Sequence, residues 1–146
     1  MDNSSVEILL VEDNADDAEM TIRALTRNKI INNVLHLEDG EDALDFLFAT
    51  GKYAGKDILQ APKLILLDLK MPKIGGMELL RKIKADEHTR KIPVVILTSS
   101  NEDPDIQKCY DLGANAYVVK PVSFDEFVKA ISNLGLFWMI TNQAPH

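Results

Sequence analysis

Residues 64–76 have the sequence LILLDLKMPKIGG, and this stretch decides the fold. Four apolar residues in a row open it, which is typical of a short strand buried on both faces of a parallel sheet. Asp68 follows the apolar run, and Gly75-Gly76 opens a segment with apolar residues at helical spacing. The stretch therefore predicts a buried strand, a polar turn and an amphipathic helix, the repeating unit of an α/β fold.

The same unit recurs on both sides of this stretch. The other expected strands are short apolar runs at residues 6–11, 34–37, 92–97 and 116–119. Each expected helix begins at a residue that is common at helix N-termini, namely Asn14, Asp39, Gly75, Asp103 and Ser123. Residues 51–62 contain glycine and proline breakers and are expected to form a loop. The pattern predicts a doubly wound, five-stranded parallel sheet of the flavodoxin-like (βα)5 type, with strand order 2-1-3-4-5 and right-handed crossovers.

Length and composition narrow the possible functions. The chain, residues 1–146, suits one domain with a core at about 6–135, an apolar tail at 136–146 and no output domain. A net charge of −7 opposes binding to nucleic acid or to an anionic membrane surface. The single cysteine, Cys109, rules out an internal disulfide, and no apolar run reaches the ~18 residues that a membrane span needs. We therefore expect a cytoplasmic protein.

Polar residues follow four of the predicted strands at the point where each strand ends. They are Glu12-Asp13, Asp68, Thr98-Ser99-Ser100 and Lys120-Pro121. In an open parallel sheet, ligands bind beyond the carboxyl ends of the strands, where the strand order reverses. The first and third strands are neighbours at that reversal, so we expect Glu12, Asp13 and Asp68 to converge on one spot.

Three converging carboxylates predict a bound cation. At ~4 Å and an effective dielectric constant of about 20, each pair of carboxylates repels by about 4 kcal/mol, which a cation or a shared proton must offset. Oxygen ligands without Cys or His suit a hard ion, and Mg²⁺ fits best because it keeps waters that a phosphate can replace. A carboxylate beside Mg²⁺ can attack a phosphorus atom and form an aspartyl phosphate.

Asp68 is the expected nucleophile, because it ends a central strand and faces the crevice. Lys120 would place a positive charge beside a phosphate oxygen, and Thr98 would donate a hydroxyl hydrogen bond. Alone, each residue has an ordinary interpretation, such as a helix cap for Asp13 or a surface position for Lys120. Only their joint placement at the ends of four strands favours a site.

Four segments resemble the receiver domains of bacterial response regulators. They are LLVEDNADD at 9–17, LILLDLKMPKIGG at 64–76, VVILTSS at 94–100 and NAYVVKPVS at 115–123. The similarity spans about residues 6–135, and the four segments together are far more specific than any one of them. The resemblance implies a phosphoprotein of a two-component phosphorelay. Such a protein takes a phosphoryl group from a sensor histidine kinase and changes conformation to signal to a partner.

The resemblance also implies which residues hold the metal ion and the phosphate. Asp68 resembles the phosphorylated residue, and Glu12 and Asp13 resemble the metal ligands. Lys70, two residues after Asp68, would offer its backbone carbonyl to the metal. The family varies at that position, and a lysine side chain there is expected to alter how long the phosphate survives.

Three further residues resemble those that respond to phosphorylation in receiver domains. Thr98 is similar to the hydroxyl that moves toward the phosphate, and Lys120 to the phosphate-binding lysine. Tyr117 resembles the aromatic residue that swings inward on activation, and the Lys120-Pro121 bond is expected to be cis. The face formed by the fourth helix, the fifth strand and the fifth helix is then expected to change shape.

The subfamily and the partners follow from other segments. The apolar tail, the 51–62 loop and residues 13–17 resemble stand-alone receivers that serve bacterial phytochrome-type kinases and tend to dimerise. The resemblance implies a phytochrome-type kinase, a homodimer and a histidine phosphotransfer protein as a candidate downstream partner. The only activities expected are self-phosphorylation and autodephosphorylation, so the chain is not expected to be an enzyme in the ordinary sense.

Three alternatives remain open at this point. A phosphatase of the haloacid dehalogenase type would want a second Asp two residues after the nucleophile, where Lys70 stands. A flavin-binding module would want a phosphate loop after the first strand, where four acids would repel a phosphate. A receiver that binds its partner without phosphorylation is disfavoured because Asp68, Thr98 and Lys120 are all present.

Overall fold

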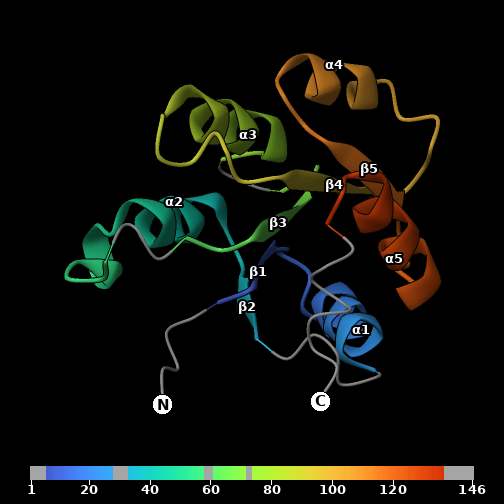
Figure 1. Ribbon diagram of the computed structural model, residues 1–146, viewed down its shortest axis with the longest axis horizontal. Helices are drawn as coiled ribbons and strands as arrows, with labels where there is room; N and C mark the ends of the chain where they lie inside the picture. The colour runs from blue at the N-terminus through green and yellow to red at the C-terminus, as the bar shows by residue number, and fades with distance from the viewer. Residues whose placement is uncertain (1–5, 28–32, 58–60, 72–73, 137–146) are drawn as a thin grey trace.

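The computed structural model describes residues 6–27, 33–57, 61–71 and 74–136, and within them five parallel strands form one sheet (Figure 1). The strands are β1 (Ile8–Val11), β2 (Val34–Leu37), β3 (Leu64–Asp68), β4 (Val94–Thr98) and β5 (Ala116–Val119). The α-helices are α1 (Ala15–Thr26), α2 (Gly40–Phe48), α3 (Gly76–Ala85), α4 (Asp105–Asp111) and α5 (Phe124–Asn133). Neighbouring strands follow the order β2-β1-β3-β4-β5, so the predicted fold and strand order are confirmed.

Two apolar layers hold the helices against the sheet. Helices α1 and α5 pack on one face, together with Ile8 and Leu10 of β1. Helices α2, α3 and α4 pack on the other face, together with Leu9 and Val11 of the same strand. Every residue of β1, β3 and β4 is at most 5% exposed. This double burial explains why these strands appear in the sequence as continuous apolar runs.

Most of the predicted helix starts are confirmed by their capping hydrogen bonds. The side chains of Asn14, Asp39 and Ser123 each accept a hydrogen bond from the backbone N–H three residues on, at 2.8, 2.8 and 3.1 Å. These bonds satisfy N–H groups that have no partner inside the helix. Gly113 follows α4 with φ +112°, a left-handed conformation that suits glycine, and so ends this helix as predicted.

β1 begins at Ile8, two residues later than expected. The ends of β3 and β4 also differ from the expected ones, and each of these two differences has a backbone cause. β4 begins at Val94 because Pro93 has no N–H to donate to the ladder. At the other end, the ladder continues one residue further than expected, pairing Asp68 with Leu97 and Thr98 with Val119. Asp68 and Thr98 are therefore held by the sheet and not by a loop.

Three smaller regions complete the comparison with the sequence. The segment expected to be a loop contains a short 3-10 helix, η1, at Gly51–Tyr53. α4 begins at Asp105, one residue later than the Asp103-Pro104 pair predicts. Of the apolar tail expected at 136–146, Leu136 is described and packs partly buried beside α1 and α5, and residues 137–146 lie outside the described residues. None of the helices in the described ranges combines the length and apolarity that crossing a lipid bilayer requires.

Gly76 lets α3 begin close against the end of β3, and this contact yields a stability prediction. A Cβ at residue 76 would lie 2.5 Å from the backbone oxygen of Asp68 and 2.8 Å from that of Leu69. Both neighbours are backbone atoms that cannot turn aside, so α3 would have to move. We expect Gly76→Ala to lower the free energy of unfolding by about 1–3 kcal/mol, measured by urea denaturation.

Gly75→Ala is the matched control. A Cβ at residue 75 would meet its nearest atom, the backbone oxygen of Met71, at 3.9 Å, an ordinary contact. We expect this variant to stay within ~0.5 kcal/mol of the wild type. Equal stability of the two alanine variants would contradict the close approach of α3 to β3.

Candidate functional site

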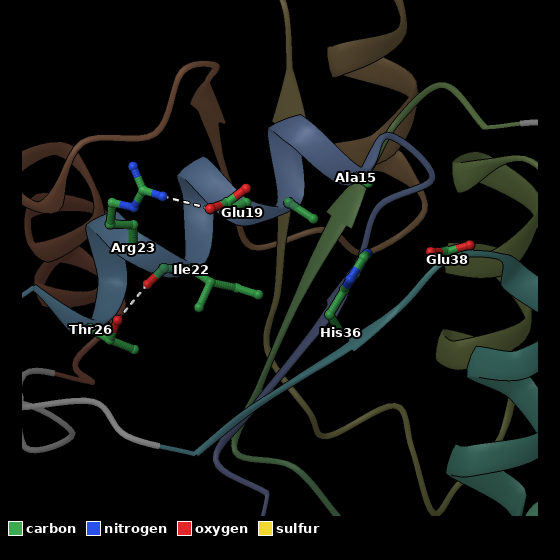
Figure 2. Close-up of a pocket in the computed structure, with 8 residues that line it drawn as sticks. Ala15, Glu19, Ile22, Arg23, Thr26, His36 and Glu38 are labelled. Atoms are coloured by element: carbon green, nitrogen blue, oxygen red, sulfur yellow. Dashed lines mark hydrogen bonds and ion pairs between the residues drawn. The ribbon is translucent and has the colours of Figure 1, made fainter.

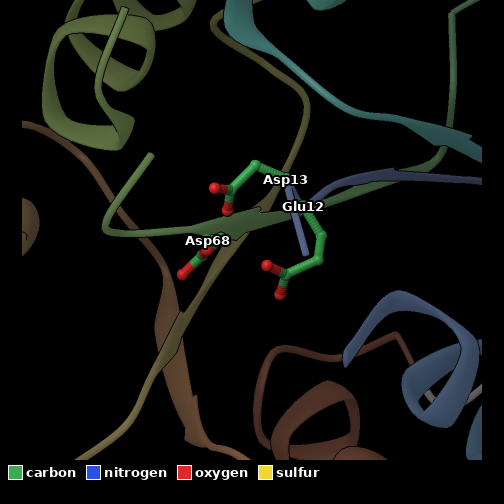
Figure 3. A group of neighbouring side chains, drawn as sticks. All are labelled: Glu12, Asp13 and Asp68. Carbon is green, nitrogen blue, oxygen red and sulfur yellow. The ribbon is translucent and has the colours of Figure 1, made fainter. Parts of the chain in front are cut away.

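Three carboxylates meet at the carboxyl edge of the sheet (Figure 3). Glu12 and Asp13 follow β1, and Asp68 is the last residue of the neighbouring strand β3. Because Val11 pairs with Leu67 in the ladder, the next residues of the two strands lie side by side. One oxygen from each carboxylate lies within 4.8 Å of the other two. The structure thus brings these acids together, as the strand order led us to expect.

Two of the three acids are buried, and a buried carboxylate needs hydrogen-bonding partners. Glu12 has no exposed surface and Asp68 is 5% exposed, whereas Asp13 is exposed. The Glu12 carboxylate accepts hydrogen bonds at both oxygens, from the Asn14 backbone N–H at 3.2 Å and from Lys120 Nζ at 3.2 Å. Such partners are what a buried charge requires.

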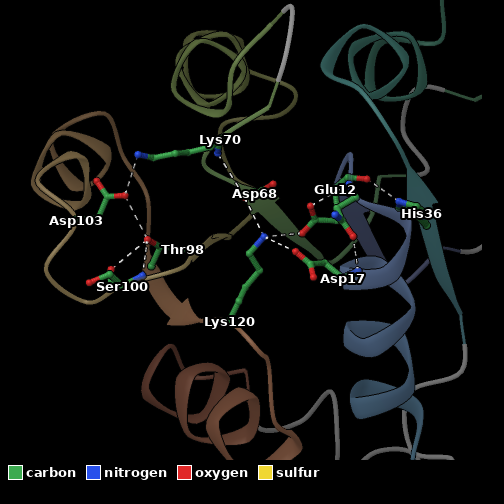
Figure 4. A network of polar contacts seen from close by, with 10 residues as sticks. Glu12, Asp17, His36, Asp68, Lys70, Thr98, Ser100, Asp103 and Lys120 are labelled. Carbon is green, nitrogen blue, oxygen red and sulfur yellow. Dashed lines mark hydrogen bonds and ion pairs between the residues drawn. The ribbon is translucent and has the colours of Figure 1, made fainter.

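Lys120 points into the acid cluster from the end of β5 (Figure 4). Its Nζ lies 3.1 Å from Asp17 Oδ2, 3.2 Å from Glu12 Oε1 and 3.5 Å from Asp68 Oδ1. The lysine side chain is 17% exposed, so these contacts are largely shielded from water. The Lys120-Pro121 peptide bond is cis, as the family resemblance implied.

One lysine does not neutralise this group of acids, and the titration behaviour reflects the imbalance. Burial, followed by the hydrogen bond and the charge of Glu12, raises the pKa of Asp68 to about 7, although the charge of Lys120 acts to lower it. Burial alone would lower the pKa of Lys120, but its hydrogen bond with Asp17 and the charge of Asp68 outweigh that effect and raise it. In the absence of metal, the site therefore retains excess negative charge.

The donor set fits a hard divalent cation. The carboxylates of Glu12, Asp13 and Asp68 supply oxygen ligands from two adjacent strand ends, and sulfur and imidazole ligands are not among this group. Oxygen-only sites favour Mg²⁺, Mn²⁺ or Ca²⁺ over softer metals. A divalent ion here would offset the repulsion from Glu12, which adds to the effect of burial in raising the pKa of Asp68.

Lys70 and Thr98 flank Asp68 on the opposite side from Glu12 (Figure 4). The backbone N–H of Lys70 donates to Asp68 Oδ1 at 3.4 Å, so the main chain at residue 70 lies beside the carboxylate. The Thr98 hydroxyl donates toward the backbone oxygen of Ser100 at 3.1 Å and toward Asp103 Oδ2 at 3.5 Å. The side chain of Lys70 reaches the same Asp103 oxygen, at 3.7 Å.

Tyr117 is the remaining residue that the resemblance singled out, and it lies in β5 beside α4. Its side chain is half-buried, and its ring centroid is 6.4 Å from that of Tyr110, at an angle of 55°. Tyr110 is 42% exposed. The switch residue expected from the sequence therefore lies half-buried in β5, with its ring against that of Tyr110 in α4.

The space beside Asp68 is small. A pocket of about 90 Å³ is lined by Asp68, Leu69, Lys70, Leu97, Thr98, Ser99, Asp103 and Lys120. Pockets for cofactors and drug-sized ligands usually measure ~300–1,000 Å³, so this one suits a small anion and not a flavin. Size therefore argues against the flavin alternative at this site.

A larger hollow, of about 470 Å³, lies between α1 and β2 and is not the site (Figure 2). Its walls include an exposed Glu19–Arg23 ion pair and the side chain of His36. The His36 Nε2 donates to the backbone oxygen of Glu12 at 2.7 Å, so this histidine supports the chain at Glu12 from the far side. The hollow is open and holds no group of buried acids, and we place the chemistry at the smaller pocket.

Sequence reasoning did not identify Asp17 or Asp103 as site residues. Asp17 lies in the first turn of α1, where an acid favours the helix dipole, yet it makes the shortest contact with Lys120. It lies one turn before Thr21, which is buried, and this helical spacing could have placed it on the side facing the sheet. No comparable signal connects Asp103 with Lys70, because they lie in different loops.

Comparisons with known proteins agree with this geometry. The family model described as "Response regulator receiver domain" matches residues 8–132. The bacteriophytochrome response regulator RtBRR is 50% identical, with a TM-score of 0.83 over 91% of this chain and 80% of its own. The phosphorylated cyanobacterial phytochrome response regulator RcpA is 36% identical, with a TM-score of 0.75 over 93% of this chain and 95% of its own.

A third relative has been solved with a metal ion. Response regulator Rcp1 of Synechocystis sp. is 36% identical over 94% of this chain and 92% of its own length. The Mn²⁺-bound form of Rcp1 has a TM-score of 0.73 over 97% of this chain and 99% of its own. Together with the acid cluster, this neighbour supports a divalent cation site in the present chain.

Proposed function

Because the chain belongs to the response regulator receiver domain family, we propose that Asp68 is the residue at which it accepts a phosphoryl group. The protein is a receiver of two-component signalling that closely matches single-domain response regulators of phytochrome signalling, and phosphorylation on Asp is general in the family. The observation that carries the assignment is the meeting of Asp68 with two further acids and with Lys120, beside a small pocket that Asp68 and Lys120 line.

Asp68 acts as the nucleophile in this proposal. A carboxylate oxygen forms a bond to the phosphorus of a phosphohistidine, the phosphorus–nitrogen bond breaks, and the imidazole leaves with a proton from solvent. We propose that Glu12, Asp13, Asp68 and the Lys70 carbonyl hold Mg²⁺, which when bound would neutralise charge on the phosphoryl oxygens. In autodephosphorylation, a water oxygen forms a bond to the phosphorus of the aspartyl phosphate, the bond between phosphorus and the Asp68 oxygen breaks, and inorganic phosphate leaves.

Lys120 and Thr98 then respond to the new charge. The Lys120 ammonium, already 3.5 Å from Asp68, exchanges an acid partner for a phosphoryl oxygen, and the Thr98 hydroxyl turns toward the phosphate. Shifting a two-state equilibrium from 1:99 to 99:1 requires about 5.5 kcal/mol. Two charge-assisted hydrogen bonds of roughly 1.5–3 kcal/mol each can supply that amount. Tyr117 and the surface of α4, β5 and α5 are the proposed readout.

The proposed phosphodonor is a sensor histidine kinase of the phytochrome type. Support comes from the names of the relatives, which include bacteriophytochrome and cyanobacterial phytochrome response regulators. A histidine phosphotransfer protein is the proposed downstream partner, and the cytoplasm the proposed location. Neither nucleic acid nor membrane is proposed as a partner, given the net charge of −7.

Phosphotransfer from a phosphorylated kinase tests this function. A phytochrome-type kinase carrying labelled phosphohistidine is mixed with the chain in Mg²⁺, and the label is followed by gel. We expect rapid transfer that stops completely in EDTA and returns when excess Mg²⁺ is added. Equal transfer with and without metal would reject the role of the acid cluster, and no transfer from any phosphohistidine donor would reject the function.

We also propose that the protein is a homodimer whose contact involves the apolar tail. The basis is the run of five apolar residues Leu136-Phe137-Trp138-Met139-Ile140, which would form an apolar patch if exposed. Sedimentation equilibrium should give a dimer for the intact chain and a monomer for a chain ending at Gly135. Identical masses for the two would reject this part of the proposal.

A further inference from the structure

Asp103 occupies a central place between the site and α4, although nothing so far assigns it a role. It lies in the β4–α4 loop and its side chain is only 7% exposed. Its two carboxylate oxygens have different partners. Oδ1 accepts the backbone N–H of Asp105 at 2.9 Å, at the start of α4. Oδ2 faces the pocket, where it lies 3.5 Å from the Thr98 hydroxyl and 3.7 Å from Lys70 Nζ.

The two groups that meet Oδ2 come from different sides of the pocket. Lys70 belongs to the loop after β3, two residues beyond Asp68, and its side chain extends toward Asp103 (Figure 4). Thr98 is the last residue of β4. Asp68, Lys70, Thr98 and Asp103 all line the same pocket of about 90 Å³. One oxygen of Asp103 therefore links two donors on either side of the space into which a phosphoryl group would enter.

We propose that Asp103 is a positioning residue that holds Lys70 and Thr98 in the unphosphorylated arrangement. This inference rests on the proposed function, because it concerns what competes with the phosphoryl group on Asp68. A phosphoryl group brings roughly −1.5 to −2 charges and three acceptor oxygens. Asp103 offers one charge to the same two donors, so phosphorylation has to draw them away from it. The Asp103 carboxylate thus opposes the phosphorylated state.

The expected size of this opposition is modest. The Lys70 side chain is 71% exposed, and ion pairs with such exposure contribute little. The Thr98 hydroxyl shares its single proton between Ser100 and Asp103, and the Asp103 contact is the longer one. We therefore expect removal of the Oδ2 charge to change the affinity for a phosphoryl mimic by about 3–10-fold and not by orders of magnitude.

Asp103→Asn tests the contacts of Oδ2 while keeping those of Oδ1. The amide keeps an oxygen that can accept from the Asp105 N–H, so the start of α4 is preserved. The other oxygen becomes an NH₂ group, which neither accepts from Thr98 nor attracts Lys70. The matched control is Glu102→Gln, which removes the same charge from an exposed neighbour whose side chain is outside the pocket.

The experiment titrates beryllium fluoride, a mimic of a phosphoryl group on a carboxylate, into each protein in Mg²⁺ and measures the dissociation constant by calorimetry. Asp103→Asn should bind the mimic about 3–10-fold more tightly than the wild type, and Glu102→Gln within about 1.5-fold of it. Unchanged or weaker binding by Asp103→Asn overturns the proposal.

Lys70→Met, made in the wild type and in Asp103→Asn, distinguishes a positioning role of Asp103 from a purely structural one. A purely structural role predicts that Lys70→Met changes the affinity for the mimic equally in both backgrounds. In the wild type, Lys70→Met removes the contact between Lys70 and Asp103, which opposes binding of the mimic. It also removes the donor that Lys70 offers to the mimic, so the two effects on affinity largely cancel. In the Asp103→Asn background only the donor to the mimic is lost, and binding should weaken by at least about threefold. Equal effects of Lys70→Met in both backgrounds overturn the coupling through Asp103.

The same titration separates this inference from the proposed function. A wild-type protein that fails to bind beryllium fluoride in Mg²⁺ rejects the phosphoacceptor site, and the positioning role of Asp103 is rejected with it. Binding by the wild type, together with no difference in Asp103→Asn, rejects only the positioning role.

Discussion

Asp68→Asn is expected to abolish phosphorylation by a small phosphodonor such as acetyl phosphate in Mg²⁺. An amide is not a nucleophile toward phosphorus under these conditions, and it also removes one anionic ligand from the proposed metal site. The carboxylates of Glu12 and Asp13 remain nearby, so the experiment asks whether either can substitute for Asp68. Intact-protein mass spectrometry, which detects the mass of one phosphoryl group, is the measurement.

Asp16→Asn is the control for this prediction. Asp16 is an exposed acid of α1, so its replacement removes one negative charge without entering the pocket. We expect this variant to be labelled like the wild type. Full labelling of Asp68→Asn would reject the nucleophile, and loss of labelling in Asp16→Asn would mean that overall charge, and not the individual carboxylate, controls the reaction.

Asp68→Asn is also expected to stabilise the metal-free protein at pH 8. The pKa of Asp68 is raised from its ordinary value of 3.8 to about 7 by burial and by Glu12. The folded chain therefore holds this proton more tightly than the unfolded chain. The stability that the proton contributes is complete below pH 3.8 and is lost as the pH rises through about 7. Asparagine cannot ionise, so it avoids that loss.

The size and the pH dependence of this effect can both be measured. In EDTA at pH 8, urea denaturation should show the variant more stable than the wild type by on the order of 2 kcal/mol. The difference should shrink toward zero near pH 4, where Asp68 is protonated. Saturating Mg²⁺ should narrow the gap at pH 8, since a ligand at 100 times its dissociation constant stabilises the wild type by about 2.7 kcal/mol. A variant less stable than the wild type in EDTA at pH 8 would contradict the account of the raised pKa.

Much of the fold was predictable because its signals are local. The Asn14, Asp39 and Ser123 caps act within three residues, and the buried runs of β1 and β3 differ plainly from the polar turns around them. The convergence of Glu12, Asp13 and Asp68 followed once the strand order was assumed. Local sequence signals therefore predicted the helices and strands, and the assumed order of the strands predicted that the three acids meet.

Contacts between distant elements were not predictable in the same way. Lys120 and Asp17 are 103 residues apart in the sequence, yet their side chains are in contact because β5 ends opposite the first turn of α1. The meeting of Lys70 with Asp103 depends on how two loops fold toward each other above β3 and β4. Neither pair has a spacing in the sequence that marks it, and side-chain direction in a loop is set by packing that only the folded chain provides.

The most direct test of the account is to locate the phosphoryl group chemically. The wild-type protein is phosphorylated in Mg²⁺, the acyl phosphate is reduced with borohydride, and the digested chain is sequenced by mass spectrometry. Reduction converts a phosphorylated aspartate to homoserine, and we predict homoserine at residue 68 in samples with Mg²⁺ and unmodified Asp68 in samples with EDTA. Homoserine at residue 13 or 17 in place of 68, or an equal yield at residue 68 without metal, would contradict the central claim.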